Sequence, residues 1–253
     1  MSDSPATASR NTSRAPSRAS VPIGAEIRGR LILRYKRFLA DIETDDGEKL
    51  TVHCPNPGSM LGCAIPGSAV RCSTSDNPKR KLRHTLEMIR IGRVWVGLNT
   101  LRANQLVLRA LQCEALPAFA GYQSIRPEAA VGSGSRLDFR LDDRAGDERP
   151  AYIEVKSVTL AEGSRARFPD SVTTRGRRHM DTLARLKRDG SRAALLFVVQ
   201  RADCDSVRPA DDIDPEYGEA LRAAVRAGVE VHAVQARVTA RSLCLESPLP
   251  VVL

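Results

Sequence analysis

Three charged side chains lie in two short apolar runs that would otherwise be expected to fill a protein core. The run SRLDF (135–139) contains Asp138, and the run AYIEVKSV (151–158) contains Glu154 and Lys156. Both runs are typical of β-strands, and residues two apart on a strand share one face. Glu154 and Lys156 are therefore predicted to point the same way, and Asp138 can join them if the two strands pair.

This combination of side chains suits phosphodiester hydrolysis. Two converging carboxylates form an oxygen-rich site for Mg²⁺ or Mn²⁺, which the backbone carbonyl of Val155 and water can complete. A lysine beside the cation can position or deprotonate an attacking water, or stabilise charge on a phosphate. We therefore predict Asp138 and Glu154 as metal ligands and Lys156 as the third catalytic residue. On spacing alone, a solvated hairpin with ordinary surface charges is the alternative.

The segment before residue 100 is rich in short strands. Apolar alternation and turn signals predict strands at 29–44, 49–54, 69–75, 85–91 and 94–99, and no helical period is visible. This pattern indicates a small antiparallel β-barrel over residues 21–100. In such barrels one face and its loops commonly bind single-stranded nucleic acid.

From residue 101 the pattern changes to alternating helices and strands. Helices are predicted at 104–112, 173–190 and 215–228, and strands at 122–129, 135–141, 151–158, 193–200 and 229–236. The run at 193–200 is continuously apolar, as in a buried parallel strand. The order predicts an α/β layer domain over residues 101–253 and hence a two-domain chain of the α+β and α/β classes.

The positive charge is concentrated in the front of the chain. The chain has a net charge of +9. Residues 21–110 hold 15 basic and 8 acidic side chains, a net charge of +7, whereas residues 111–253 hold 21 of each and are neutral. This asymmetry predicts a polyanionic partner for the front domain, most often nucleic acid. A surface that is merely arginine-rich is the alternative, because the chain has 33 Arg and 6 Lys.

Three basic groups are candidates for phosphate contact. The block RYKRF places cations beside Tyr35 and Phe38, whose rings could stack on bases or fill the barrel core. The block NPKRKLR (77–83) is a loop with dense positive charge. Arg175 lies near the start of the helix at 173–190, where the helix dipole favours a phosphate. The predicted nucleic-acid-binding residues are Arg34, Lys36, Arg37, Lys79, Arg80, Lys81, Arg83 and Arg175.

Other features restrict the class of protein. Residues 1–20 are rich in Ser and Arg, have no large apolar residue after Met1 and are predicted to be disordered. The six cysteines include no CxxC pair and indicate reduced thiols, and no membrane span or signal peptide is visible, so a cytoplasmic protein is expected. His179 could shuttle protons, although a helix histidine in this setting is more often structural, and Asp170 is interpreted as a turn or cap residue.

Seven blocks of the sequence, in order, resemble the bacterial and archaeal sugar fermentation stimulation protein A family. They are RYKRFLADI, HCPNPGSM, SDNPKRK, SRLDF, YIEVKSVTL, FPDSVTTRG and the closing LPVVL, and the match spans residues 21–253. The resemblance implies an N-terminal OB-fold domain and a C-terminal restriction-endonuclease-like core with a mixed sheet, as in the PD-(D/E)xK nucleases. It also implies DNA binding and a link to the regulation of sugar-utilisation genes.

Carried onto this sequence, the nuclease-like triad of that resemblance falls on Asp138, Glu154 and Lys156. Two positions depart from the pattern. Leu137 precedes the aspartate in place of a proline. Arg109 stands in the helix at 104–112, where family members tend to have a glutamate, and it is expected to weaken a metal site if it lies close.

Two main functions follow from the sequence. The first is a DNA-binding enzyme, a Mg²⁺- or Mn²⁺-dependent endonuclease or exonuclease. The second is a non-catalytic DNA-binding regulator that keeps the nuclease fold as a scaffold. An interaction protein whose basic domain meets an acidic partner is a third interpretation. DNA is the expected partner, with single-stranded nucleic acid or RNA as further candidates, no membrane is expected, and the oligomeric state is left open.

Overall fold

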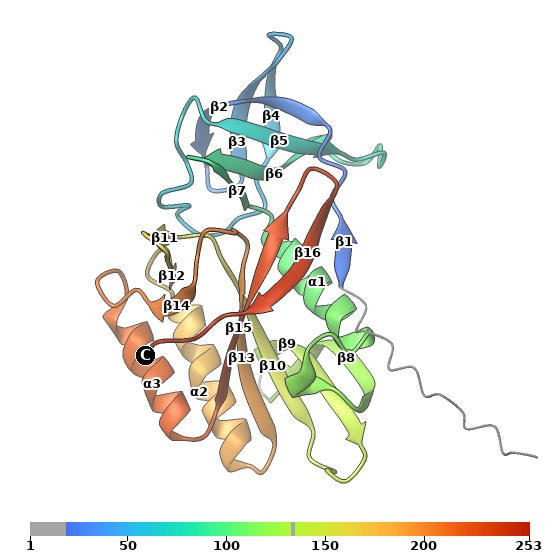
Figure 1. Ribbon diagram of the computed structural model, residues 1–253, viewed down its shortest axis with the longest axis vertical. Coiled ribbons are helices and arrows are strands. Elements are labelled where there is room, and N and C mark those ends of the chain that lie inside the picture. The colour runs from blue at the N-terminus through green and yellow to red at the C-terminus, as the bar shows by residue number, and fades with distance from the viewer. Residues whose placement is uncertain (1–18, 133–134) are drawn as a thin grey trace, which may run out of the picture.

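A computed structural model describes residues 19–132 and 135–253 of the chain. Most of the tail predicted at residues 1–20 lies outside the described residues. Figure 1 shows a small β-barrel stacked on one end of a larger domain, in which helices pack on both faces of a central sheet. The predicted fold class, a barrel followed by a mixed α/β domain, is confirmed.

The barrel is a six-stranded sheet closed by one extra pairing. Its strand order is β4-β3-β2-β5-β6-β7, and β4 returns to β6 through the pair His53 and Thr85. Alternate residues such as Ile42 and Val52 point inward and are fully buried, because strand side chains alternate between faces. The strands are β2 (Ile27–Tyr35), β3 (Leu39–Thr44), β4 (Lys49–His53), β5 (Ala69–Thr74), β6 (His84–Ile91) and β7 (Val94–Gly97).

The larger domain is built on a seven-stranded mixed sheet in the order β1-β16-β15-β13-β10-β9-β8. Its centre, β10-β13-β15, is parallel, and the outer pairs are antiparallel. The strands are β1 (Ser20–Pro22), β8 (Tyr122–Val131), β9 (Ser135–Arg144), β10 (Ala151–Val158), β13 (Arg192–Val199), β15 (Glu230–Val238) and β16 (Ser242–Pro248).

Helices cover both faces of this sheet, so β10 and β13 are buried except at Lys156, Ser157 and Arg192, which are half-buried. The first helix packs with one face of the sheet in one apolar cluster, and the other two helices pack in a second cluster on the opposite face. A small sheet in the order β11-β12-β14 lies beside them. These elements are α1 (Thr100–Gln112), the 3-10 turn η1 (Pro117–Phe119), β11 (Ala161–Glu162), β12 (Arg165–Phe168), α2 (Thr174–Arg188), β14 (Ser206–Pro209) and α3 (Pro215–Arg226).

The start of the described chain belongs to the larger domain. The sequence assigned residues up to 20 to a tail and residues from 21 to the barrel, but β1 pairs with β16 at the edge of the seven-stranded sheet. Val21 and Ile23 are buried in the core cluster that includes α1. Burial of these apolar side chains in that core stabilises the position of the segment. The barrel therefore begins only at β2.

A loop of the barrel joins the two domains. The N–H of Met60 donates to Asp170 Oδ2 at 2.8 Å, and the Ser59 hydroxyl donates to the carbonyl of Asp170. Asp170 therefore connects the domains, whereas the sequence indicated only a turn or cap. Between this contact and the sheet lies a cleft of about 460 Å³. Among the described residues, no helix is long and apolar enough to cross a membrane.

Candidate active site

The two strands that carry the predicted triad separate at the triad itself. β9 pairs with β10 only from Ala151 to Ile153, whereas β10 stays paired with β13 as far as Val158. In the gap, Asp138 Oδ2 accepts the N–H of Val155 at 2.7 Å and so replaces the missing strand partner. The N–H and C=O of a strand residue point to the same edge, so the carbonyl of Val155 also faces this gap.

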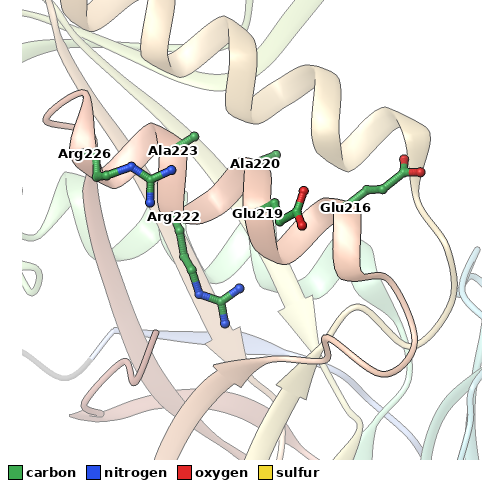
Figure 2. Close-up of a pocket in the computed structure, with 6 residues that line it drawn as sticks. All are labelled: Glu216, Glu219, Ala220, Arg222, Ala223 and Arg226. Atoms are coloured by element: carbon green, nitrogen blue, oxygen red, sulfur yellow. The ribbon is translucent and has the colours of Figure 1, made fainter.

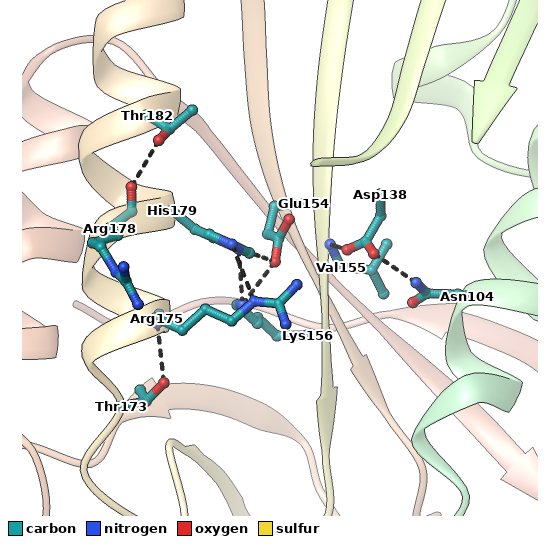
Figure 3. Close-up of polar contacts among 11 residues, drawn as sticks. Asn104, Asp138, Glu154, Val155, Lys156, Thr173, Arg175, Arg178, His179 and Thr182 are labelled. Atoms are coloured by element: carbon teal, nitrogen blue, oxygen red, sulfur yellow. Dashed lines mark hydrogen bonds and ion pairs between the residues drawn. The ribbon is translucent and has the colours of Figure 1, made fainter. Parts of the chain in front are cut away.

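The opposite side of β10 holds Glu154, whose side chain is buried. One oxygen, Oε1, accepts Lys156 Nζ at 2.7 Å and also the ring nitrogen Nδ1 of His179 in a short contact. The other oxygen, Oε2, is buried and has no hydrogen-bond partner among the residues that the structure describes. Figure 3 shows the two carboxylates on either side of Val155, with Glu154 toward α2 and Asp138 toward α1.

Each of these helices contributes a side chain that holds one carboxylate. From α1, the amide of Asn104 donates to Asp138 Oδ1 at 2.6 Å. From α2, His179 contacts Glu154, and its Nε2 accepts from Arg175 Nε at 3.4 Å. An ionised carboxylate can only accept and an arginine can only donate, so the tautomer with its proton on Nδ1 satisfies the contacts of His179 with both Glu154 and Arg175. His179 therefore contacts the triad, whereas the sequence favoured a structural role for it over proton shuttling.

The two carboxylates have pKa values shifted in opposite directions. Burial and the neighbouring Glu154 carboxylate raise the pKa of Asp138 to about 6. Burial also acts to raise the pKa of Glu154, but hydrogen bonds and charges from His179 and Lys156 outweigh it and leave that pKa below its ordinary value. Above pH 6 the site therefore holds two close negative charges, an arrangement typical of functional sites.

In the metal-free protein, Asp138→Asn is expected to raise the free energy of unfolding at pH 8 by about 1–2 kcal/mol. The folded pKa of about 6 exceeds the ordinary 3.8, so the wild type should lose stability as the pH rises from about 4 to about 6. Asparagine removes that charge but accepts one hydrogen bond fewer. Urea unfolding in EDTA at pH 4.5 and pH 8 measures the difference, and a variant that is less stable at pH 8 would contradict the charge effect.

Three oxygen donors around Val155 are of the type that a hard divalent cation prefers. The unpartnered Glu154 Oε2 needs a positively charged or hydrogen-bonding neighbour, since an unpaired buried carboxylate oxygen is costly. Asp138 and the Val155 carbonyl add oxygen donors, which Mg²⁺ and Mn²⁺ prefer. Within residues 19–132 and 135–253, no three His, Cys, Asp or Glu side chains gather as a ligand set, so water would have to complete the coordination.

The cleft above these carboxylates is lined by cations from both domains. Arg37 of the barrel and Arg175 of α2 reach it, together with Lys156. Arg167 also lines it, but that guanidinium is paired with Glu162 and Asp212. Two of the five arginines predicted to contact phosphate, Arg37 and Arg175, therefore line the same cavity as the triad.

The other predicted phosphate-binding residues lie on the barrel surface. Lys36 is exposed in the turn between β2 and β3, and four exposed cations occupy the loop between β5 and β6. In the described part of the chain none of them forms an ion pair with a carboxylate, although the Arg80 guanidinium does donate to Thr85. These loop residues are Lys79, Arg80, Lys81 and Arg83.

The Arg34 guanidinium is engaged by backbone carbonyls of the barrel, so its contacts do not support its predicted assignment to phosphate binding. It donates to the carbonyls of Arg37, Asn56, Gly58 and Ser59 at 2.7–3.1 Å. These bonds hold the loop that docks on Asp170. An arginine with its terminal amino groups engaged in this way has no free pair of donors to offer a phosphate.

Arg109 does not line the cleft that contains the two carboxylates. It is exposed on α1 and is absent from the cleft lining, while Asn104 supplies the contact to Asp138. Asn104 and Arg109 are five residues apart, which corresponds to a rotation of about 140° around the helix axis. Their side chains therefore leave α1 in different directions. The expected weakening of the metal site by Arg109 is therefore not supported by its position.

A second hollow lies on the outer surface of α3 (Figure 2). All of its lining residues come from that one helix, and Arg222 and Glu216 are paired with Asp211 and Arg177. It has no buried charged group of the kind found beside Val155. Its lining residues are Glu216, Glu219, Ala220, Arg222, Ala223 and Arg226.

Two protein-family models match consecutive parts of the chain. The SfsA N-terminal OB domain matches residues 32–98, and the Sugar fermentation stimulation protein RE domain matches residues 101–242. The junction between them falls between β7 and α1. The two models therefore divide the chain where the barrel ends.

Similar proteins cover both domains. A sugar fermentation stimulation protein homolog from Pelobacter propionicus is 50% identical over 227 residues, which are 90% of this chain and 97% of the relative. The homolog from Halorhodospira halophila is 50% identical over 225 residues, with coverage of 88% and 93%. The structure of SfsA from Pyrococcus furiosus in complex with Ca²⁺ has a TM-score of 0.82 and 26% identity, and the alignment covers 90% of this chain and 96% of that one.

Proposed function

The chain belongs to the sugar fermentation stimulation protein family, and we propose that it is a DNA-binding enzyme that cleaves phosphodiester bonds with Mg²⁺ or Mn²⁺. The observation that carries this proposal is the unpartnered, buried oxygen of Glu154 beside a second carboxylate, Asp138. One lysine, Lys156, faces these two carboxylates, and the remaining negative charge favours a bound cation. The Pyrococcus furiosus relative in complex with Ca²⁺ supports a hard divalent ion in this family.

Each residue of the site has a distinct task in this proposal. Asp138, Glu154 and the Val155 carbonyl would hold the cation, which when bound polarises the scissile phosphate and makes an attacking water more acidic. Lys156, only 13% exposed, directs its amine beside Glu154 and donates to a phosphate oxygen or to the attacking water. His179 keeps Oε1 of Glu154 engaged, so that Oε2 is left for the cation.

The cations of the cleft and barrel give the substrate class. Arg37 and Arg175 line the cavity that contains the triad, and the loop from Lys79 to Arg83 adds unpaired positive charge on the same domain as Arg37. Unpaired lysines and arginines neutralise phosphates and release counterions, whereas ion-paired ones do not. DNA is the proposed partner on this basis.

A non-catalytic DNA-binding regulator of sugar-utilisation genes is the second candidate. It is favoured by one observation, the engagement of both Asp138 oxygens by Val155 and Asn104. Lys156 is likewise bonded to Glu154. A site in which neighbouring residues hold Asp138 and Glu154 holds Lys156 can serve as a stable scaffold without a cation.

A cleavage assay separates the two candidates. Purified protein is incubated with supercoiled plasmid, single-stranded DNA and RNA in Mg²⁺, in Mn²⁺ and in EDTA. The enzyme proposal expects metal-dependent cleavage of at least one DNA substrate by the wild type. DNA binding without cleavage in either metal would contradict the enzyme and favour the regulator.

A further inference from the structure

Phe38 presents an aromatic ring to solvent at the turn between β2 and β3. Its side chain is 43% exposed, and among residues 19–132 and 135–253 every other aromatic residue is buried or half-buried. Tyr35, the other ring of this block, is half-buried and donates to Asp41. The exposure of Phe38 is therefore not a general property of the aromatic residues in this chain.

The turn that carries Phe38 is held in a fixed and unusual conformation. Lys36 and Arg37 have φ of 45° and 64°, the left-handed region that non-glycine residues seldom adopt. The Arg34 guanidinium holds the carbonyl of Arg37 at 2.8 Å, and Arg37 Nε donates to the carbonyl of Pro57 at 2.9 Å. Strained backbone that the surroundings hold in place is concentrated at binding sites.

A second ring and two cations adjoin Phe38. The centroid of the His53 ring lies 6.5 Å from that of Phe38 at an interplanar angle of 34°, and the Arg37 guanidinium lies 5.6 Å from the Phe38 centroid. His53 pairs with Thr85, to which Arg80 donates at 3.0 Å, so the basic loop borders the rings. Burial and the charge of Arg80 lower the pKa of His53, which leaves its ring uncharged at neutral pH.

Arg37 connects this aromatic surface to the cleft of the triad. Arg37, which stacks beside Phe38, also lines the cavity that contains Asp138 and Glu154. A flat apolar ring bordered by unpaired cations matches a nucleotide, which has a base to stack and a phosphate to neutralise. A base within a duplex is already stacked on both faces, so only an unpaired base can use the ring.

We propose that Phe38 and His53 form a stacking site for an unpaired base of DNA, whose backbone passes Arg37 into the cleft with Asp138 and Glu154. This inference rests on the proposed function and deepens it, because it specifies the substrate as DNA with a single-stranded segment next to the position of cleavage. Arg37 and Arg80 hold the flanking phosphates.

Fluorescence anisotropy in EDTA tests the stacking site without any cleavage. Labelled single-stranded 20-mers and the matching duplex are titrated with the wild type, with Phe38→Ala and with Phe38→Tyr. Phe38→Ala is expected to weaken single-strand binding between about 5-fold and 100-fold and duplex binding by less than about twofold. Phe38→Tyr keeps a ring and is expected to bind like the wild type.

Leu33→Ala is the matched control, because Leu33 is 52% exposed on the adjoining strand β2. It should leave both affinities unchanged. Three results would each overturn the stacking site. They are an equal loss of affinity for single strand and duplex in Phe38→Ala, no loss of affinity in Phe38→Ala, and the same loss of affinity in Leu33→Ala. If the Phe38 effect is found but the wild type never cleaves DNA, the stacking site stands and the enzymatic function fails.

Discussion

Replacing Glu154 with glutamine is expected to reduce metal-dependent DNA cleavage by at least about a thousandfold. The amide keeps the size of the side chain but removes the negative charge and the free carboxylate oxygen that the cation would use. It also leaves Lys156 and His179 without an anionic partner in a buried position. Initial rates on plasmid in Mn²⁺ measure the loss, and a thermal melt shows whether the variant is folded.

Lys156→Met tests the contribution of the amine to cleavage separately from that of the proposed metal ligands. Methionine retains the length and apolar stem of lysine, so cleavage is expected to fall by about a hundredfold to a thousandfold while Mn²⁺ binding persists. Glu154→Gln should lose both cleavage and Mn²⁺ binding. Glu219→Gln and Lys187→Met, on the outer helices α3 and α2, are the matched controls and should cleave normally. Undiminished cleavage in both triad variants would assign the activity to another site.

Neutralising the basic loop of the barrel is expected to have the largest effect on DNA binding. Replacing Lys79, Arg80, Lys81 and Arg83 with glutamine should weaken affinity on the order of a hundredfold at low salt. Each phosphate contact that is lost should make the log–log salt slope shallower by about 0.9. The loop side chains are exposed and have no carboxylate partner in the described part of the chain, so their whole charge is available to phosphate.

The matched control removes positive charge that is already paired. Arg126, Arg149 and Arg222 each bond an aspartate on the larger domain, at Asp142, Asp147 and Asp211. Changing these three to glutamine should alter DNA affinity by less than about threefold and leave the salt slope nearly unchanged. An equal loss in the two sets of variants would show that net charge, and not the loop, determines binding.

The sequence predicted those parts of the site that follow from local periodicity. Glu154 and Lys156 share a face because strand side chains alternate, and both contact His179 of α2 on that face. The alternating and continuous apolar runs likewise predicted the barrel and the buried strand β13. These features depend only on neighbours in the chain, so one sequence suffices to predict them.

The contacts that complete the site come from helices far away in the chain. Asn104 and His179 reach the carboxylates from opposite faces of the sheet, and no local pattern records which helix residue will face a given strand. One signal for His179 was present, because it adjoins Met180 and lies four residues before Leu183 on the buried face of α2. A polar side chain on such a face needs a partner.

Two basic residues show where pattern and position differ. Arg109 stands where the family resemblance implies a glutamate, and it is exposed on α1 and does not line the cleft. Arg34 belongs to the same sequence block as Arg37, but its guanidinium donates hydrogen bonds to four backbone carbonyls of the barrel. Residues close together in a short block can thus have opposite roles, because the turn between them decides where each points.

The most direct test of the metal site is calorimetric titration of the wild type and Glu154→Gln with Mn²⁺ at pH 7.5. At this pH, above the pKa of about 6, Asp138 is ionised and does not hold a proton that the cation must displace. The wild type is expected to bind about one Mn²⁺ per chain, and Glu154→Gln none. No binding by the wild type, or the same isotherm in both proteins, would contradict a cation held by Asp138 and Glu154.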